Sequence, residues 1–233
     1  MSVPLIIALV SAGQVRKLSI EIFGFLVFVI FVRLLIFLFR SSRKGVVNCR
    51  RREEVMNMMT QLATQMNVKL HPTKSLDIAP EFKGASCVQL PFLSGCKVHF
   101  GGKVRVGCTI LCSLDNPALR GVFAHELAHL RKWHPMKILL CFVTFIIIPV
   151  LVYIFVINPI IPVFLTVTIE VLVLSLISWH FEYEADGVGA DFVQKKDMAN
   201  ALEQAAKVIA RPGHSLTHPS FEKRISRLLS DKK

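Results

Sequence analysis

Three long apolar segments limit the folds that this chain can adopt. They cover residues 20–39, 138–157 and 160–179. Each is about 20 residues long, enough for a helix to cross a hydrocarbon core roughly 30 Å thick. Their only charged residues are Glu21, Arg33 and Glu170. We therefore predict three transmembrane helices, with the last two forming a hairpin because the prolines at 159 and 162 favour a turn.

The net charge of +12 is concentrated on one flank of the first predicted span. The basic residues that follow it are Arg40, Arg43, Lys44, Arg50, Arg51 and Arg52. Only Arg16 and Lys17 lie on the other flank, so the positive-inside rule predicts a cytoplasmic loop after this span and an N-terminus outside. Juxtamembrane basic clusters bind anionic headgroups, so we expect the lipid bilayer, and not nucleic acid, to be the partner of this charge.

Residues 1–19 contain an apolar run at 4–10 that is too short to span a membrane. Arg16 and Lys17 follow this run, whereas in a signal peptide the positive charges come first. We expect an interfacial or poorly ordered N-terminal segment.

The six cysteines do not indicate a disulfide framework or a zinc ribbon. Cys108 and Cys112 are spaced CxxxC without a matching second pair. Free thiols are the expectation for a domain on the cytoplasmic side.

The segments between and after the spans predict an α+β domain. Residues 52–66 carry apolar residues at helical spacing, whereas residues 67–112 hold short β-type runs separated by Gly and Pro, which predict a small twisted sheet. A helix is expected from Asp115 to about Trp133, since Pro117 favours its first turn and Pro135 disfavours its continuation. Further helices are expected at 197–209 and within 218–229.

The helix predicted after Asp115 contains the sequence HELAH. His125 and His129 are four residues apart, so both imidazoles lie on one face of a helix and can bind one ion. Glu126 is offset by about 100°, which allows it to reach a water on that ion but not to be a third ligand beside them. This HExxH pattern predicts a zinc site with Glu126 as general base. The alternative is an ordinary amphipathic helix with solvated His and Glu.

A second pair of residues supports the zinc interpretation. A catalytic zinc needs three protein ligands and an open position. In FEYEAD, Glu182 and Asp186 are again four residues apart. Glu182 can be the third ligand, and Asp186 can accept a hydrogen bond from a ligand histidine and fix its tautomer. Glu184 projects elsewhere, and we expect it to be solvated.

The two candidate ligand segments flank the predicted hairpin at 138–179. His129 precedes its entry by nine residues and Glu182 follows its exit by three, so both lie on one side of the bilayer. At about 1.5 Å per residue, the metal is expected within roughly 15 Å of the membrane surface. Trp133 and Trp179 fit an interfacial aromatic belt.

Two ionisable residues lie inside predicted spans. Arg33 and Glu170 are expected at depths that differ by about 3 Å. We predict an ion pair between them. The alternative is that Arg33 extends to the surface and Glu170 is protonated.

The motifs HELAH, EYEAD and HPSFEKRI, with a membrane hairpin between the first two, together resemble those of the HtpX-type integral-membrane zinc metalloproteases, which are related to the CAAX prenyl protease. The resemblance covers residues 50–230. The chain departs from that family in having one clear span before the catalytic helix instead of two. It also has GASCVQLPFLSG near the place of the family's Asn-Ala-Phe-type loop.

The resemblance implies the roles of six residues. His125, His129 and Glu182 would bind Zn²⁺, and Glu126 would be the general base. His218 would stabilise an oxyanion, and Arg224 would be a structural or active-site arginine.

The resemblance also implies a division of the chain. The catalytic domain would comprise residues 40–137 and 180–233, interrupted by the hairpin. It would face the cytoplasm from a bacterial-type inner membrane, as part of an integral multi-pass protein.

The expected activity is zinc-dependent endopeptidase hydrolysis of membrane or misfolded polypeptides. A non-catalytic scaffold or holdase is the alternative, although it would have no chemical need for Glu126. A channel is disfavoured because three spans with two ionisable residues offer little to line a path. The run at 103–111 is either an edge strand that pairs with an extended substrate or an internal strand of the sheet.

Overall fold

A computed structural model of the chain describes residues 51–73, 75–79, 84–94, 97–156, 160–209 and 217–230. All of these residues belong to one compact unit, Lys44–Lys233. The predicted N-terminal segment 1–19 and the first predicted span 20–39 lie outside the described residues.

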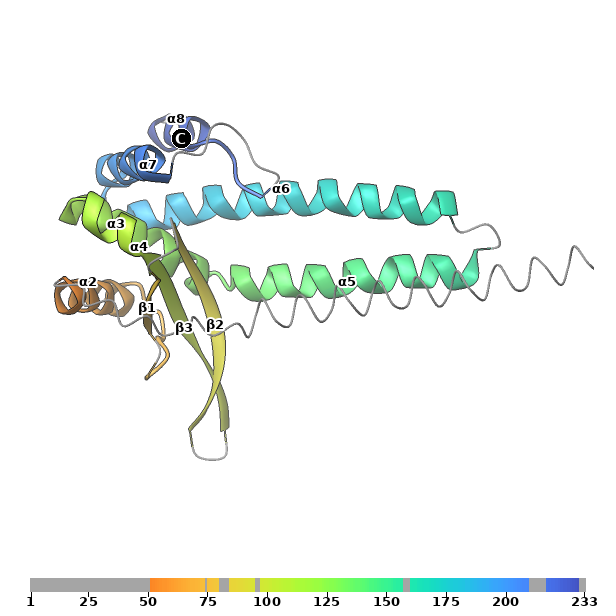
Figure 1. Cartoon of the computed structure of the whole chain (residues 1–233), viewed down its shortest axis with the longest axis horizontal. Coiled ribbons are helices and arrows are strands. Elements are labelled where there is room, and N and C mark those ends of the chain that lie inside the picture. Colours follow the sequence, from red (N-terminus) through yellow and green to blue (C-terminus); the bar gives the residue numbers. More distant parts are fainter. Residues whose placement is uncertain are drawn as a thin grey trace, which may run out of the picture. The chain divides into compact units, whose positions relative to one another are not determined.

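The described part of the chain contains one three-stranded sheet, with the strand order β1-β3-β2. The strands are β1 (Leu76–Ala79), β2 (Ala85–Ser94) and β3 (Lys97–Gly107). β3 pairs in parallel with β1 and antiparallel with β2, and β2 and β3 form the long twisted ribbon in Figure 1. Because β3 is central, the edge-strand interpretation of the run at 103–111 is wrong, and β2 occupies an edge.

Two further predictions for this region are wrong. The start of the predicted β region at 67–112 is not a strand in its described part, residues 67–73, which contains an isolated bridge between Leu70 and Gly102. The run at 103–111 ends in a helix, α3 (Cys108–Ser113). Ile110 and Leu111 are buried there, with 1% and 0% exposure. Burial in the core therefore outweighs the β propensity of this short sequence, as is common for β-forming residues.

The soluble part of the unit is built around one helix, α4. The helices here are α2 (Arg52–Gln65), α4 (Asn116–Arg131), α7 (Lys195–Ile209) and α8 (Phe221–Leu229). The carboxylate of Asp115 accepts a hydrogen bond of 2.8 Å from the Ala118 amide, and Pro117 lies in the first turn, so α4 begins where the sequence predicts. α4 packs against α2, α6, α7 and β2, which makes it the central element of the core.

The remaining two helices, α5 (His134–Phe155) and α6 (Ile160–Val193), are long and apolar enough to cross a membrane, and within the described residues they alone are. They lie side by side and extend away from the sheet (Figure 1). Their large apolar side chains are exposed, for example Phe164 at 70% and Leu176 at 67%. An apolar surface of this kind is stable in hydrocarbon rather than in water. Two of the three predicted spans thus correspond to exposed apolar helices.

α4 and α5 are separated by a sharp change of backbone direction. Trp133 has a φ of 59°, in the left-handed region that ends a helix. α5 then starts at His134 with Pro135 in its first turn, four residues before the predicted apolar segment. The same turn places Trp133, 47% exposed, at the start of the hairpin, where its ring contacts that of Phe100.

α4 can approach α6 and α7 closely because glycines lie at the contacts. A Cβ at Gly189 of α6 would stand 3.2 Å from the backbone of both Ala124 and His125. A Cβ at Gly121 of α4 would stand 2.5 Å from the Cβ of Ala201 in α7. A methyl group at either position would push α4 away from a neighbouring helix.

Gly121→Ala is expected to lower the free energy of unfolding by about 1–3 kcal/mol, because overpacking forces two helices apart. Gly187→Ala is the matched control, since a Cβ there would meet nothing within 4 Å. It should be neutral or stabilising by up to about 1 kcal/mol, because Ala favours helix over Gly. Thermal unfolding of the detergent-solubilised chain measures both, and equal melting temperatures for the two variants would contradict this packing.

Candidate metal centre

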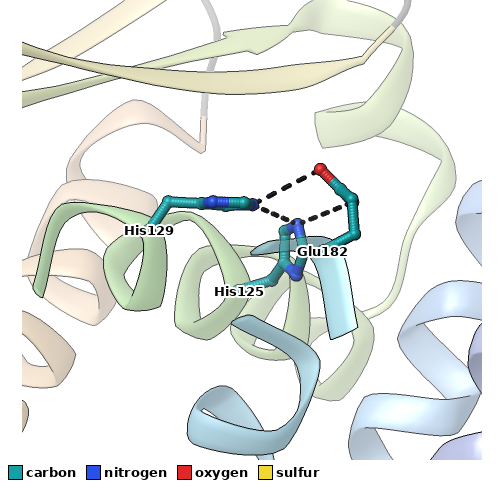
Figure 2. A group of neighbouring side chains, drawn as sticks. All are labelled: His125, His129 and Glu182. Atoms are coloured by element: carbon teal, nitrogen blue, oxygen red, sulfur yellow. Dashed lines mark hydrogen bonds and ion pairs between the residues drawn. The ribbon is translucent and has the colours of Figure 1, made fainter. Parts of the chain in front are cut away.

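Three side chains from α4 and α6 meet at one point. His125 and His129 project from the same face of α4, and Glu182 projects toward them from α6 (Figure 2). The Nε2 atoms of the two histidines are 3.1 Å apart. Each lies 3.5 Å from one carboxylate oxygen of Glu182. The structure therefore brings together the three residues that the sequence proposes as ligands.

The spacing and chemistry of these donor atoms suit a zinc ion. Zinc binds imidazole nitrogen and carboxylate oxygen at roughly 2.0–2.2 Å in a tetrahedral arrangement, which places neighbouring donors roughly 3.4 Å apart. The separations of 3.1 and 3.5 Å are close to that spacing, and each imidazole faces a different oxygen of Glu182. All three donors lie within 4.8 Å of one another, and His125 and Glu182 are buried.

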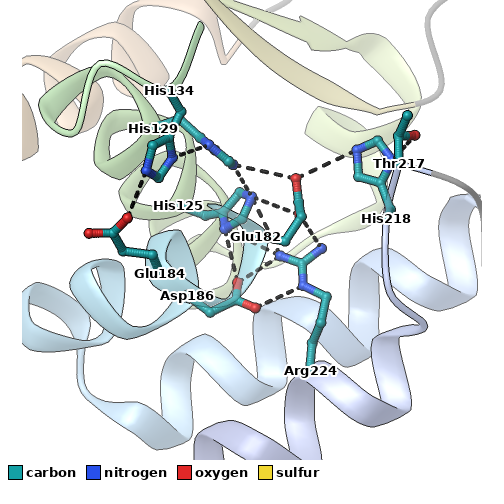
Figure 3. A network of polar contacts seen from close by, with 9 residues as sticks. All are labelled: His125, His129, His134, Glu182, Glu184, Asp186, Thr217, His218 and Arg224. Carbon is teal, nitrogen blue, oxygen red and sulfur yellow. Dashed lines mark hydrogen bonds and ion pairs between the residues drawn. The ribbon is translucent and has the colours of Figure 1, made fainter. Parts of the chain in front are cut away.

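A buried arginine joins the third candidate ligand to an outer carboxylate. Arg224 of α8 is 6% exposed and lies 2.9 Å from Glu182 through Nη1. Its Nε and Nη2 donate hydrogen bonds of 2.8 and 2.6 Å to the two oxygens of Asp186 (Figure 3). Burial opposes the charge of Arg224, but the carboxylates of Asp186 and Glu182 outweigh it and raise its pKa above the ordinary value. The three charges thus form one fixed group.

Asp186 also contacts the first histidine. Its Oδ1 lies 2.9 Å from Nδ1 of His125, the ring nitrogen that faces away from the cluster. A histidine whose Nε2 binds a metal carries its proton on Nδ1, so His125 donates to Asp186. This is the contact that the sequence predicts for Asp186, and it depends on the i, i+4 spacing of residues 182 and 186.

The second histidine has an outer partner that sequence reasoning missed. Nδ1 of His129 lies 2.8 Å from Nδ1 of His134, and Nε2 of His134 lies 3.0 Å from Glu184 (Figure 3). Lys132 forms a 2.8 Å ion pair with the same carboxylate. The prediction that Glu184 is solvated is therefore wrong. A helical wheel directs it away from Glu182, but the turn at Trp133 brings His134 to it.

Glu126, the proposed general base, is buried with 7% exposure. The thiol of Cys87 in β2 lies close enough to this carboxylate to lower the pKa of Glu126, although this effect is smaller than that of burial. Burial disfavours the ionised form and raises the pKa of Glu126, while the nearby His125 and His129 act in the opposite direction. The edge strand β2 therefore contacts the residue beside the candidate ligands.

His218 lies at the rim of the centre. Its Nε2 is 3.6 Å from Oε1 of Glu182, and its Nδ1 is 2.8 Å from the hydroxyl of Thr217. Its side chain is 46% exposed. His218 is thus next to the candidate ligands and also open to solvent.

Other predicted features have mixed outcomes. Among the described residues, Cys87, Cys112 and Cys141 are thiols that form no disulfide. Glu170 is buried with 8% exposure, but its predicted partner Arg33 lies outside the described residues. The predicted ion pair between them stays a prediction.

Comparison with known proteins identifies a family and several similar solved structures. The model of peptidase family M48 matches residues 49–232 of this chain. Among solved structures, the chain is similar to the crystal structure of S. mikatae Ste24p, with 16% sequence identity and a TM-score of 0.50. The match covers 97% of this chain and 62% of that one, so the chain spans less than two thirds of that protein's length. No curated protein matches the chain.

Arg224→Gln is expected to lower the free energy of unfolding of the metal-free chain by about 3–5 kcal/mol, because two carboxylates then lose their buried counter-charge. Adding Asp186→Asn should restore part of the loss, since it removes one of those charges. Chemical or thermal unfolding in detergent measures both effects.

Arg227→Gln on the same helix is the matched control for this experiment. Arg227 is exposed, and its guanidinium stacks over the ring of Tyr183 at 4.4 Å. Loss of that contact is expected to cost about 1 kcal/mol or less. If Arg224→Gln costs no more than Arg227→Gln, the buried charge group does not stabilise the fold.

Proposed function

Because this chain belongs to peptidase family M48, we propose that it is a membrane-embedded, zinc-dependent endopeptidase. Its substrates are membrane or misfolded polypeptides, cleaved near the cytoplasmic surface. The observation that carries the proposal is the approach of His125, His129 and Glu182 to within 4.8 Å of one another. The proposed location is a bacterial-type inner membrane, in which the chain is an integral multi-pass protein.

His125, His129 and Glu182 would hold the zinc ion. When bound, the ion supplies a Lewis acid that polarises the scissile carbonyl and acidifies a water molecule. Arg224 and Asp186 would keep two of these ligands in place, because they contact Glu182 and His125.

Glu126 would act as the general base. It follows His125 on α4, so its carboxylate lies beside the ligands and not among them. It would accept a proton from the attacking water and donate it to the leaving amine. Its burial and raised pKa suit a group that must exchange a proton in each half of the reaction.

His218 would stabilise the oxyanion that develops on the scissile carbonyl. Its Nε2 is 3.6 Å from the candidate ligand Glu182, and its exposure of 46% leaves it accessible to a substrate. This role requires a protonated Nε2 that donates a hydrogen bond to the substrate oxygen.

The edge strand β2 would bind an extended substrate. β2 pairs with β3 on one side only, within the described sheet. It lies along α4, since the Gln89 amide donates a hydrogen bond of 3.2 Å to the carbonyl of Leu130. A peptide that adds to the free edge of β2 would gain main-chain hydrogen bonds and would pass beside Glu126, which Cys87 of the same strand contacts.

Glu126→Gln is expected to reduce cleavage of an unfolded model polypeptide by about 10²- to 10⁴-fold, because the amide cannot accept the proton of the water. Zinc content should remain one equivalent per chain. Time-resolved gel analysis of cleavage and metal analysis of the same samples measure the two quantities.

Glu203→Gln is the matched control for this test, since Glu203 is 61% exposed and forms an ion pair with Lys207 one turn away. It should cleave at the wild-type rate. A wild-type chain that binds zinc but cleaves nothing, or cleavage that persists in Glu126→Gln, would contradict the proposed mechanism.

The proposed orientation predicts a labelling pattern. In two variants that each keep a single cysteine, a membrane-impermeant maleimide applied to intact cells should label Asn158→Cys and leave the exposed native Cys112 unlabelled. Cys112 should react after permeabilisation. Labelling of Cys112 in intact cells would place the catalytic domain on the opposite side.

A further inference from the structure

His134 is a completely buried polar residue that the proposed mechanism does not use. Its side chain has 0% exposure, and its ring stacks on that of Phe181 with centroids 4.2 Å apart and planes 7° apart. A phenylalanine would fill this space and make the same stack. The presence of an imidazole therefore points to its two ring nitrogens, both of which have polar partners.

The direction of the hydrogen bonds follows from the candidate ligand. With a zinc ion bound, Nε2 of His129, which faces His125 and Glu182, would use its lone pair as the ligand and leave the proton on Nδ1. His129 therefore donates through Nδ1 to Nδ1 of His134, at 2.8 Å. His134 then carries its own proton on Nε2 and donates it to Glu184, at 3.0 Å.

This arrangement gives each candidate histidine ligand its own outer partner. His125 donates to Asp186 directly, and His129 donates to Glu184 through His134. Both carboxylates come from α6, two and four residues after the third ligand, Glu182. The motif EYEAD would thus supply one ligand and two orienting carboxylates, one for each histidine.

Glu184, the last residue in this series of hydrogen bonds, is held in place by an ion pair. Glu184 is 26% exposed and forms a 2.8 Å ion pair with Lys132. Lys132 and His134 flank Trp133, whose left-handed backbone allows both side chains to reach the same carboxylate. The turn between α4 and α5 therefore places His134, the first residue of α5, where it contacts both His129 of α4 and Glu184 of α6.

We propose that His134 and Glu184 are positioning residues that fix the tautomer and ring orientation of His129 and so strengthen zinc binding. This proposal rests on the zinc site of the proposed function. It means that His134, the first residue of α5, helps to hold the metal. Loss of an outer partner of this kind weakens metal affinity by roughly 10- to 100-fold in other zinc sites.

The test is the zinc affinity of the full chain in detergent, measured by competition with a chelator. His134→Phe keeps the ring stack and removes both nitrogens, and we expect its zinc affinity to fall by roughly 10- to 100-fold. Glu184→Gln keeps the shape and removes the charge, and should lose affinity in the same direction. His134→Asn presents an amide oxygen near the place of Nδ1, so it should bind zinc more tightly than His134→Phe.

A purely structural role would give different results. It would lower the melting temperature of the metal-free chain and leave the zinc affinity and the visible absorption spectrum of the Co²⁺-loaded chain unchanged. The matched control is Glu203→Gln, which also removes a carboxylate from a 2.9 Å lysine pair but far from the centre, and it should bind zinc as the wild type does. If His134→Phe does not fold, the partly exposed Glu184 still decides the question.

Zinc affinities of His134→Phe and Glu184→Gln within twofold of the wild type would overturn this inference and leave the proposed function intact. If only Glu184→Gln is soluble, a zinc affinity equal to that of the wild type would likewise overturn this inference. A wild-type chain that binds no zinc would overturn both proposals, since His134 and Glu184 cannot orient a zinc ligand if zinc does not bind.

Discussion

The contact between α4 and α6 is the constraint on which the candidate centre depends. α4 carries two histidines on one face, but only the approach of α6 supplies Glu182. That approach requires the absence of a side chain at Gly189, which lies against the backbone of Ala124 and His125. The helix contact thus includes the backbone of the first candidate ligand, and a shift of either helix would change the donor separations directly.

The charges in this core are consistent with a bound cation. Three buried carboxylates, Glu126, Glu182 and Asp186, face one buried arginine, Arg224. If all are ionised, the group carries a net charge of −2, which a divalent ion would neutralise. Burial of uncompensated charge is costly, so the same residues that would bind the ion also gain stability from it. Metal binding and folding are therefore expected to be coupled.

The sequence predicts the candidate ligands well because they follow a simple rule. His125 and His129, and then Glu182 and Asp186, are each spaced by four residues, and helical periodicity alone puts each pair on one face. Local rules fail where distant contacts decide. The run at 103–111 stays a strand only as far as Gly107 and is helical from Cys108, where Ile110 and Leu111 are buried in the core. Glu184 is directed away from Glu182, and no helical wheel can show that a left-handed residue at 133 brings His134 to meet it.

The most direct measurement is a crystal structure of the zinc-incubated chain, with anomalous diffraction data collected at the zinc absorption edge. The account predicts one anomalous peak roughly 2.0–2.2 Å from Nε2 of His125, Nε2 of His129 and a carboxylate oxygen of Glu182. A map without a peak at this position, or a peak held by other residues, would contradict the central claim that α4 and α6 form a zinc site.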